Sequence, residues 1–441
     1  MDKWRYVRNS DQLLNDGWKE GKRFLLETLD YALTLADPYR AAQAVVQVRG
    51  QDVIIAGHVV PRGGAIHFIG AGKASAPIAE AVEEVLGDRL AGGICVLKRG
   101  QQCSTQRLDV WESDHPIPTD ASFQAGRAMM DYAAQVRPGE VVICGITGGS
   151  SALVSLPPRG VPWEEKAELH RLLLASGIPI GHINTVRKHV SRIKGGRLAE
   201  AMPEARIFNL TVSDVAGDAL DLITDPTVVD TSTYEDARAV LRVAGLWHRI
   251  HPAIRDHLVR GGEQPPQLPQ VESTTLLVTG TRVADAVAAY ARQTGVPAFV
   301  YSTTVSGEAR EVGRVLAAYA RERLFRRESG LTILVGGETT ATVPVSHLGA
   351  GGPNMEMALS FGCEVHGQRG VAFLSADSDG QDGSTELAGA IADGDTVKEV
   401  MACEEALTRH EALSWVRTGG FGIETGQTRT NINDISLLLV E

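Results

Sequence analysis

The sequence has few aromatic residues, few cysteines and no long apolar run. Phe, Trp and Tyr make up 5% of the 441 residues, although apolar residues as a whole make up 43%. The five cysteines are odd in number and form no Cys-x-x-Cys pair, which argues against a disulfide framework or a zinc site. No apolar segment reaches the length of a membrane span, and the first residues, MDKWRYVR, lack the apolar core of a signal peptide. We therefore expect a cytoplasmic protein without a membrane partner.

Positive charge is also in deficit. The chain has 43 Lys and Arg residues against 54 Asp and Glu residues, a formal net charge of −11. Nucleic acids and anionic membranes bind basic surfaces, so we expect neither as a partner, although small anions can still bind local basic pockets. A chain of this length exceeds what one compact core usually holds, which predicts two domains. Small molecules are therefore the expected ligands.

Short buried apolar runs alternate with helical patterns along the chain. Runs such as Ile66–Ile69 and Val141–Ile146 are each followed by a glycine-rich loop and then by helical spacing of apolar residues. This alternation predicts an α/β protein with largely parallel sheets in both halves. The segment Gly261–Ser273 is polar, contains three prolines and lacks periodicity, so we predict it as a linker. The predicted domains are residues 1–260 and 274–441, and the final strand is a candidate to return to the first domain.

Ligands of open α/β sheets collect at the carboxyl ends of the strands. Five loops of this chain leave a predicted strand and are rich in Gly, Ser, Thr or acidic residues. They begin near Gly70, Thr147, Ser213, Gly336 and Asp377. One such loop is common, whereas five in one chain indicate that the strand ends carry the functional site.

The loop that contains Gly70, Gly72 and Lys73 is a strand-to-helix turn. Such a turn can offer backbone N–H groups and a lysine ammonium group to a phosphate. It is neither a Walker A loop nor a dinucleotide fingerprint, because Ser75 occupies the third glycine position of the fingerprint. Where a dinucleotide fold has an acidic ribose ligand, the chain has Lys98 and Arg99. From the residues alone, a phosphate site and a tight turn with a solvated lysine explain the loop equally well.

The second loop carries Gly148, Gly149, Ser150 and Ser151 at a predicted helix start. Flexible backbone and two hydroxyl groups suit an anion or a carboxylate, but a plain N-cap at either serine explains the same residues. The loop is not a G-x-S-x-G elbow, and no His–Asp pair can be assigned to a serine. We therefore do not expect hydrolase chemistry.

Three acidic residues in these loops are candidate metal ligands. Asp214 and Asp218 leave one predicted strand together, and Asp379 follows another. Carboxylate and water oxygens are the ligands that Mg²⁺ prefers, although acidic residues of this kind also form ordinary turns. The residues by themselves leave both interpretations open.

The segment 184–201 predicts one helix with a polar stripe, interrupted at its end by Gly195 and Gly196. Asn184, Arg187, Ser191 and Lys194 share this stripe, next to the apolar stripe that contains Val186. A solvated helix face is the ordinary explanation of such a charge pattern.

Taken in order, these motifs resemble those of the type II glycerate kinases, whose C-terminal part is called the MOFRL domain. The motifs are G-A-G-K-A from Gly70, H-P-I-P-T-D-A-S from His115, T-G-G-S-S-A-L from Thr147, N-T-V-R-K-H-V-S-R-I-K-G-G from Asn184, S-D-V-A-G-D from Ser213, G-G-E-T-T from Gly336, D-G-Q-D-G from Asp379 and T-N-I-N-D from Thr430. They span nearly the whole chain, and the motif from Asn184 is long and specific. The resemblance implies a Rossmann-like parallel-sheet N-terminal domain, a smaller α/β C-terminal domain of the MOFRL type, and an active site in the cleft between them.

The resemblance further implies an enzyme that phosphorylates D-glycerate from ATP with a divalent metal, usually at the 2-hydroxyl. It assigns a catalytic role to Lys73. Phosphoryl transfer needs cations, a metal and a fixed acceptor, so we predict Asp214, with Asp218 or Asp379, as Mg²⁺ ligands. The predicted substrate- and phosphate-binding residues are Gly70, Gly72, Gly148, Gly149, Ser150, Ser151, Asn184, Arg187, Lys188, Lys194, Glu338 and Asn354. Among the cations, Arg187 has the bidentate geometry that best suits a carboxylate.

The sequence departs from the family pattern at Pro353, where the family has an arginine that we associate with catalysis. Proline cannot supply the planar cationic donor of a guanidinium group. We predict that Arg429, which stands at the position of a family glycine, restores this charge as a catalytic residue; otherwise the acceptor is a related hydroxy or sugar acid. Two alternative functions are an NAD(P)H-dependent hydroxypyruvate reductase and a non-catalytic sensor of a sugar acid or nucleotide. A homodimer is compatible with the sequence.

Overall fold

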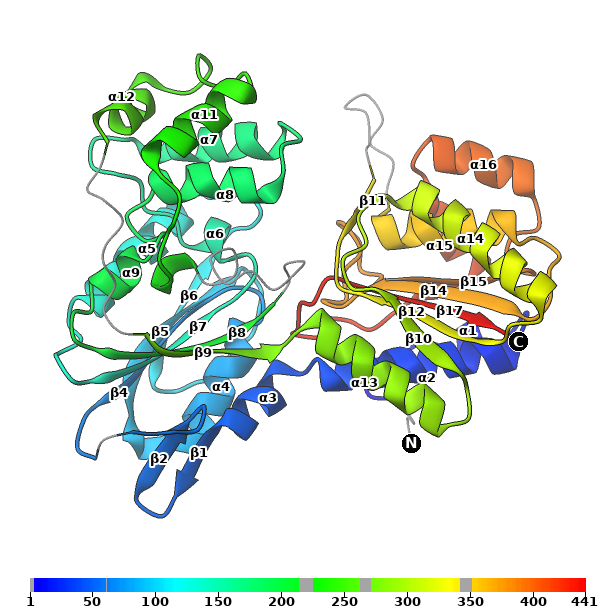
Figure 1. Ribbon diagram of the computed structural model, residues 1–441, viewed down its shortest axis with the longest axis horizontal. Helices are drawn as coiled ribbons and strands as arrows, with labels where there is room; N and C mark the ends of the chain where they lie inside the picture. The colour runs from blue at the N-terminus through cyan, green and yellow to red at the C-terminus, as the bar shows by residue number, and fades with distance from the viewer. Residues whose placement is uncertain (1–3, 61, 214–224, 262–270, 342–350) are drawn as a thin grey trace. The chain divides into compact units, whose positions relative to one another are not determined.

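The chain folds into two compact units in the computed structural model, which describes residues 4–441 apart from 61, 214–224, 262–270 and 342–350 (Figure 1). The parallel-sheet unit contains Pro38–Ser213 and the segment that ends at Leu277. The mixed-sheet unit contains Met1–Asp37 and Val278–Glu441. Within the described residues, no helix is long and apolar enough to cross a membrane.

The parallel-sheet unit is built on a six-stranded sheet with the order β6-β5-β4-β7-β8-β9. Its strands are β4 (Ile66–Ala71), β5 (Leu90–Lys98), β6 (Leu108–Ser113), β7 (Val141–Ile146), β8 (Arg206–Val212) and β9 (Val271–Val278). The strands from β6 to β8 pair in parallel. Every position of β7 is buried, as expected for a central strand that is covered on both faces. The α/β fold with a parallel sheet is therefore confirmed for this part of the chain.

Helices and a small antiparallel sheet surround the parallel strands. The helices are α3 (Pro38–Val45), α4 (Ser75–Leu86), η1 (Gly87–Arg89), α5 (Asp120–Ala133), α6 (Ser150–Leu153), α7 (Trp163–Leu174), α8 (Ile180–His189), α9 (Arg197–Glu200), η2 (Asp225–Thr227), α11 (Tyr234–Val243) and α12 (Pro252–Arg260), and the small sheet is β1 (Val46–Arg49), β2 (Asp52–Ile55) and β3 (His58–Val60). One apolar cluster joins the sheet to α5, and a second joins α7, α8, α11 and α12 to one another. This second cluster supports the helical layer that carries the predicted anion-binding residues.

The mixed-sheet unit has the strand order β10-β12-β17-β14-β15-β16. Its strands are β10 (Ala298–Ser302), β12 (Gly330–Val335), β14 (Val371–Asp377), β15 (Gly389–Asp393), β16 (Gly422–Ile423) and β17 (Asp434–Val440), with β11 (Gly307–Glu308) and β13 (Thr339–Thr340) as a separate short pair. Only β10 and β12 pair in parallel within the larger sheet, and the pairings from β12 to β16 are antiparallel. The prediction of a largely parallel sheet is therefore wrong for this half, because a buried strand is a continuous apolar run whichever way its neighbours point.

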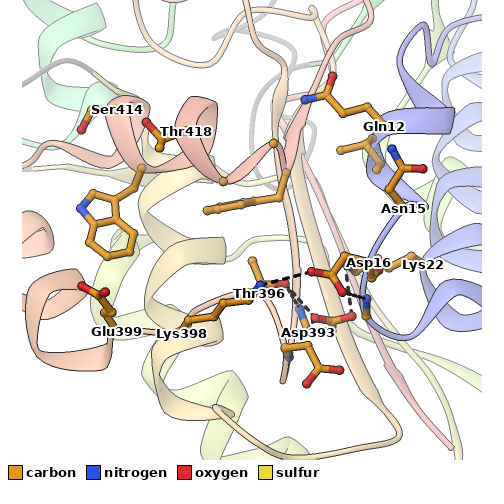
Figure 2. A pocket seen from close by; sticks show the side chains of 17 residues that line it. Gln12, Asn15, Asp16, Lys22, Asp393, Thr396, Lys398, Glu399, Ser414 and Thr418 are labelled. Carbon is orange, nitrogen blue, oxygen red and sulfur yellow. Dashed lines mark hydrogen bonds and ion pairs between the residues drawn. The ribbon is translucent and has the colours of Figure 1, made fainter.

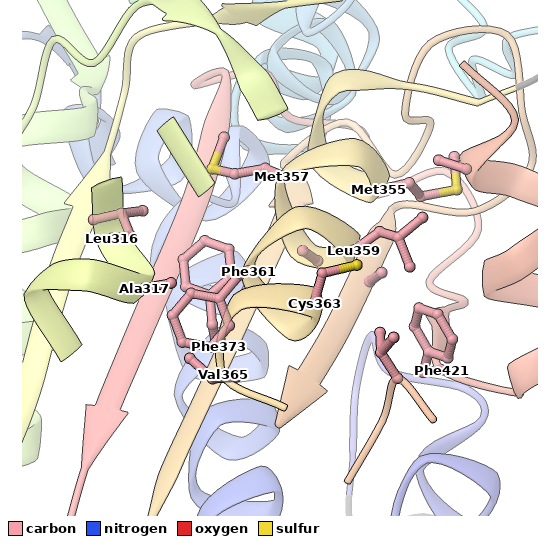
Figure 3. Packing of buried hydrophobic residues seen from close by; sticks show 14 of the residues in the cluster. Leu316, Ala317, Met355, Met357, Leu359, Phe361, Cys363, Val365, Phe373 and Phe421 are labelled. Carbon is pink, nitrogen blue, oxygen red and sulfur yellow. The ribbon is translucent and has the colours of Figure 1, made fainter. Parts of the chain in front are cut away.

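A large part of the core of this unit lies where α14 (Ala309–Arg326) and α15 (Pro353–Glu364) pack on each other and on the sheet. The helices are α1 (Ser10–Leu13), α2 (Lys19–Leu35), α13 (Gly280–Gln293), α14 (Ala309–Arg326), α15 (Pro353–Glu364), α16 (Val400–Thr408) and α17 (Ala412–Gly419). Figure 3 shows α15 in the middle of the cluster, where Phe361 packs on Phe373 of β14 with ring centroids 4.9 Å apart. Positions 354–363 of α15 are all buried, so this helix is covered on all sides. A disulfide joins Cys363 of α15 to Cys403 of α16, although the cysteine pattern predicted no disulfide framework.

The division of the chain differs from the predicted domain boundaries at both ends. The first 37 residues belong to the mixed-sheet unit, because α2 packs against β14, β17 and α13. Tyr31 stacks on Tyr290 with ring centroids 4.4 Å apart, and Lys22 forms a buried ion pair with Asp393 at 3.2 Å. The final strand, β17, lies between β12 and β14 and does not return to the parallel-sheet unit. The predicted linker also ends earlier than expected, because β9 begins at Val271; residues 262–270 lie outside the described residues.

Candidate functional site

Lys73 lies in the turn between β4 and α4, at the carboxyl end of the central strand of the parallel sheet. Its side chain is half-buried, and Gln101 Nε2 donates a hydrogen bond to the Lys73 carbonyl at 3.1 Å. The Cγ of Lys73 lies 3.4 Å from the point where a Cβ at Gly149 would stand. The loops after β4 and β7 therefore meet at Lys73, as expected for neighbouring parallel strands.

The backbone N–H groups of this turn are used within the protein. Gly72 N donates to Val96 O at 3.3 Å, Lys73 N to Gly148 O at 2.9 Å and Ser75 N to Gly72 O at 3.3 Å. The N–H of Ala74 donates to the Thr147 hydroxyl at 3.1 Å. These four N–H groups therefore do not form the phosphate cradle that the glycines suggested, and Lys73 stays the predicted phosphate-binding residue of this turn.

Gly72 is required by close approach of the two loops. Its φ is 134°, and a Cβ at this position would lie 2.2 Å from Oγ1 and 2.6 Å from the carbonyl oxygen of Thr147. A side chain therefore cannot be added without moving the loop that contains Gly148 and Gly149.

The loop after β7 begins a helix of one turn. Gly149, with φ of 84°, precedes α6, whose four residues start at Ser150. Ser150 is buried and Ser151 is half-buried. Neither serine is the N-cap, so the alternative of a plain serine cap does not describe this loop. The two hydroxyl groups stay the predicted anion-binding groups of this loop.

His115 connects this loop to a region of positive charge. Its imidazole Cδ2 and Nε2 lie 3.3 and 3.5 Å from the Cβ position of Gly149. It also acts electrostatically on the buried His170 of α7. Burial lowers the pKa of His170 to about 2, and the nearby cations Arg187, Lys166 and Lys194 lower it in the same direction. We call Lys166, His170, Arg187, Lys194 and His115 the basic cluster.

The basic cluster is fixed by direct hydrogen bonds. Arg187 Nη2 lies 2.6 Å from His170 Nε2, so the neutral imidazole accepts a hydrogen bond from the guanidinium group. Arg187 Nη1 donates to Asn184 Oδ1 at 3.3 Å. The Lys166 ammonium group donates to the carbonyl of Val190, where α8 has just ended. The predicted residues Asn184 and Arg187 are thus adjacent, buried and oriented by α7.

The predicted helix 184–201 is interrupted, and its polar residues are buried. The helix α8 ends at His189, and Gly195 and Gly196 adopt positive φ before α9. Ser191 Oγ accepts hydrogen bonds from the N–H groups of Ile193 and Lys194 and so closes the turn between the helices. Arg187 and Lys194 are 9% and 3% exposed, which contradicts the solvated face that the charge pattern favoured. The sequence placed an interruption at Gly195 and Gly196, near the end of the predicted helix, whereas α8 already ends at His189.

Lys188 has a partner that the sequence did not indicate. Its ammonium group lies 2.8 Å from Oδ1 of Asp230, and both side chains are at least 95% buried. Hydrogen bonds and charge interactions with Lys188 and Ser232 keep the pKa of Asp230 below its ordinary value, although burial acts in the opposite direction. This ion pair anchors α8, the helix that carries Arg187 of the basic cluster, to the segment that precedes α11.

The mixed-sheet unit gathers other predicted residues at one end of its strands. Asn354, in the first turn of α15, donates through Nδ2 to Asp434 Oδ1 at 2.7 Å and to Asp382 Oδ1 at 3.2 Å. Asp382 also accepts the backbone N–H groups of Asn354 and Met355, which begin α15. Burial raises the pKa of Asp382 to about 7, and burial raises the pKa of Asp434. Asn354 is therefore part of a buried network that fixes the start of α15.

The remaining predicted residues of this unit surround the same strand ends. Pro353 is the first residue of α15, a position that suits proline because no N–H is needed there. Asp379 is half-buried and its Oδ1 accepts the N–H of Gln381 at 2.9 Å. Arg429 and Glu338 are exposed, and Arg429 has a φ of 69°, which explains why the family has glycine at its position.

Metal binding stays a prediction. Asp214 and Asp218 lie outside the described residues, and among the described residues no group of three or more His, Cys, Asp or Glu side chains is arranged to hold a metal ion. Asp379 remains the described candidate, in a turn that also contains Asp377.

A cavity of about 660 Å³ in the mixed-sheet unit contains none of the predicted residues (Figure 2). It lies between the N-terminal segment and α17, and Asp393 at the end of β15 accepts hydrogen bonds there from Trp18 N at 2.7 Å and Thr396 Oγ1 at 2.8 Å. The buried Lys22–Asp393 pair forms one wall of this cavity.

Comparisons with known proteins agree with the motifs. Residues 24–259 match the model described as a domain of unknown function, DUF4147, and residues 331–434 match the MOFRL family. A glycerate 2-kinase of Pyrococcus horikoshii is 34% identical over 94% of this chain and 96% of its own length. The chain belongs to the glycerate kinase family. The crystal structure of a glycerate kinase from Thermotoga maritima superposes with a TM-score of 0.82 at 31% identity, over 96% of this chain and 100% of that one. A protein of Agrobacterium vitis named as a putative hydroxypyruvate reductase is 33% identical over 97% of this chain and 98% of its own.

Three residues of the basic cluster were not predicted from the sequence as site residues. Lys166 and His170 lie on α7, which carried no motif, and His115 was quoted only as the start of one. No spacing rule relates them to Arg187, because they come from three separate segments. The basic cluster exists only in the folded chain.

Proposed function

We propose that this protein transfers the γ-phosphoryl group of ATP to the 2-hydroxyl of D-glycerate, with Mg²⁺ as the metal. The observation that carries this proposal is the 34% identity to a glycerate 2-kinase over nearly the whole of both chains. The basic cluster and Lys73, brought to one end of the parallel sheet, support it independently, because both substrates are anions.

The basic cluster provides the charge needed to bind a carboxylate. The groups that act on His170 are all cationic side chains or another imidazole: Arg187, Lys166, Lys194 and His115. Like charges gathered at a buried position repel one another, and an anion among them relieves that repulsion. Arg187 is the member whose planar fork matches a carboxylate, and its hydrogen bonds to His170 and Asn184 fix the plane of that fork.

Lys73 is proposed to act on the transferred phosphoryl group. Phosphoryl transfer is accelerated mainly by positioning and by positive charge that neutralises the oxygens of the transferred group. The backbone of Lys73 is fixed on both sides, by its N–H to Gly148 and by its carbonyl to Gln101. The ammonium group is thus carried by a rigid turn, which reduces the cost of reorganisation when the reaction proceeds.

ATP and Mg²⁺ are the further parts of the proposal. Mg²⁺ bound to the phosphates of ATP would neutralise negative charge on them, and Asp214, Asp218 and Asp379 are the predicted protein ligands. Arg429 stays our prediction for the charge that Pro353 does not supply. A cytoplasmic location and a homodimer also stay predictions.

Hydroxypyruvate reduction is the second candidate, because relatives carry that name. One feature of the site favours the kinase. In a dinucleotide-binding turn the third glycine allows close packing of helix and strand, but here that position is Ser75, whose hydroxyl donates to Gly145 O at 2.7 Å. The space next to the strand is therefore filled by the protein itself.

The deciding experiment measures ADP release with D-glycerate, ATP and MgCl₂. Addition of enolase without phosphoglycerate mutase then identifies the product, because phosphoenolpyruvate absorbance appears at once only from 2-phosphoglycerate. A parallel reaction with hydroxypyruvate and NADH or NADPH tests the reductase. No ADP release on glycerate or on a panel of other small hydroxy acids would contradict the kinase, and binding without turnover would favour the sensor.

Two variants separate the proposed roles within the same assay. We expect R187K to raise the KM for glycerate with a smaller change in kcat, because lysine keeps the charge and loses the fork. We expect K73A to lower kcat by about 100-fold or more, the size of effect seen when a preorganised charge is removed from a transition state. Full turnover by K73A would contradict the role given to Lys73.

A further inference from the structure

The cavity between the N-terminal segment and α17 combines an apolar interior with polar walls (Figure 2). Leu13 and Phe421 line it and are 3% and 5% exposed, so they form its buried part, and the half-buried indole of Trp415 belongs to the same lining. The Phe421 ring lies against the end of α17, because a Cβ at Gly419 would stand 2.3 Å from its Cε1. A volume of about 660 Å³ accommodates a small organic molecule. We call this space the α1–α17 cavity.

The charged side chains that line the α1–α17 cavity carry more negative than positive charge. They are the carboxylates of Asp16, Asp393, Asp395 and Glu399 and the ammonium groups of Lys22 and Lys398. Lys22 lies 3.2 Å from Asp393, and both side chains of this pair are buried. Lys398 lies 3.6 Å from Asp16, but the two side chains are 77% and 75% exposed, so this contact contributes little.

Two of the four carboxylates are available to a ligand. Asp393 is already used within the protein, since it accepts hydrogen bonds from Trp18 N at 2.7 Å and from Thr396 Oγ1 at 2.8 Å in addition to its ion pair. Asp395 and Glu399 are exposed, and neither carboxylate forms an ion pair or a hydrogen bond with another of the described residues. An incoming cation therefore needs to break no existing contact to reach them.

The carboxyl end of α17 adds to the negative potential of the cavity. The helix ends at Gly419, and Thr418, Gly419 and Gly420 all line the cavity. The carbonyl groups of a last helical turn carry partial negative charge, which favours a cation nearby. Figure 2 shows Asn15 across the cavity from Thr418 and Glu399, where the amide oxygen of Asn15 is a further acceptor.

We propose that the α1–α17 cavity binds a small organic cation, with a primary ammonium group on an aromatic body. Asp395 and Glu399 bind the ammonium group, and Trp415 and Phe421 contact the body. An aromatic face attracts a cation as well as an apolar group, so the same wall serves both parts of the ligand. None of these residues has a role in the proposed kinase function, and the basic cluster would repel the same ligand.

The first test compares two ligands that differ only in charge, by isothermal titration calorimetry on the full chain at neutral pH. Phenethylamine is a cation, and 2-phenylethanol has the same ring and chain with a neutral hydroxyl group. We expect phenethylamine to bind about tenfold more tightly, because only the amine is attracted by the carboxylates and by the helix end. Equal affinities, or no binding of phenethylamine, would overturn the proposal. The assay contains neither ATP nor glycerate, so its outcome does not depend on the kinase assay.

The second test removes the two available charges. D395N/E399Q keeps the size of both side chains and should weaken the binding of phenethylamine about fivefold, while the affinity for 2-phenylethanol stays unchanged. E405Q is the matched control, because Glu405 is exposed on α16 and does not line the cavity. All three positions are exposed, so both variants should melt at the temperature of the wild type. Wild-type affinity in D395N/E399Q would overturn the proposal.

The third test locates the ligand. Hydrogen exchange followed by mass spectrometry should show slower exchange in α1 and α17 when phenethylamine is present, and this protection should be weaker in D395N/E399Q at the same ligand concentration. W415L should weaken the binding of the amine and of the alcohol by a similar factor, because the indole contacts the body that both ligands share. Protection confined to the parallel-sheet unit would overturn the proposal, and unchanged affinities in W415L would overturn the role of Trp415.

Discussion

The clearest quantitative prediction concerns His170 at the centre of the basic cluster. Burial and the neighbouring cations lower the pKa of its imidazole from 6.5 to about 2. Below pH 6.5 the unfolded chain therefore binds a proton at this position that the folded chain does not bind. The stability that depends on neutral His170 is fully present above pH 6.5 and is lost as the pH falls toward 2.

The magnitude follows from the two pKa values. At pH 5, which is 1.5 units below the ordinary value, the folded state loses about 2 kcal/mol relative to pH 7.5, at about 1.36 kcal/mol per unit. H170Q removes the titrating group and keeps an oxygen that can accept the hydrogen bond from Arg187. The variant should therefore lose about 2 kcal/mol less than the wild type between pH 7.5 and pH 5.

The measurement is urea unfolding at both pH values, followed by tryptophan fluorescence. The parallel-sheet unit contains Trp111, Trp163 and Trp247, so its transition can be followed if the two units unfold separately. The difference between variant and wild type at pH 7.5 gives the packing cost of the substitution. Subtracting this cost from the difference in unfolding free energy between H170Q and the wild type at pH 5 leaves the contribution of proton binding by His170.

A matched substitution provides the control. His182 lies on the exposed side of α8 and outside the basic cluster, so H182Q serves as the control for the same substitution away from the cluster. A double difference for H170Q below about 0.5 kcal/mol would refute the reasoning. It would mean that the basic cluster does not act on His170 as the structure indicates.

Three further predictions test the surroundings of the site. Gly72→Ala should destabilise the protein by more than about 2 kcal/mol and abolish activity, because the new side chain meets Thr147. Gly100→Ala is the control, since Gly100 also has a positive φ but has open space around it, and should cost about 1 kcal/mol. Equal melting temperatures of the two variants would contradict the close approach of the loops. Asp230→Ala should lower the free energy of unfolding in urea by about 3–5 kcal/mol, because it leaves the charge of Lys188 buried without its partner Asp230. The double variant K188M/D230L should recover more than half of that loss. A double variant as unstable as D230A would contradict the ion-pair explanation. Arg429→Gly should raise the free energy of unfolding by up to about 1 kcal/mol, because Arg429 has a positive φ. R429G and R429A should both lower kcat about tenfold. An unchanged kcat in both variants would refute a catalytic role for the guanidinium group.

The strand-end loops of the parallel sheet could be predicted from the sequence because their signals are local. An apolar run followed by Gly-Ala-Gly-Lys identifies a strand, a turn and a helix within about a dozen residues, and the structure places β4 and α4 there. The rule that ligands collect at the carboxyl ends of the strands singled out both loops, and the structure then places Lys73 next to Gly149 because β4 and β7 are neighbours.

Burial of the polar residues on α8 could not be predicted in the same way. A helix pattern shows which residues share a face, but not whether another helix covers that face. The charge pattern favoured a solvent-facing position for Arg187 and Lys194. In the structure both are buried, and Lys166 and His170 of α7 lie in the same basic cluster. The partner of Lys188, Asp230, lies 42 residues away, and nothing in the charge pattern connects the two.

The sequence by itself determined the α/β class, the loops that end the parallel strands and, through its motifs, the family. The tertiary structure decided which half the first 37 residues join, the antiparallel pairing of β17 and the composition of the basic cluster. The physical reason is the range of the forces involved. Turns and helix starts depend on neighbouring residues, whereas strand direction, burial of charge and the pKa of His170 depend on segments that meet only after the chain has folded.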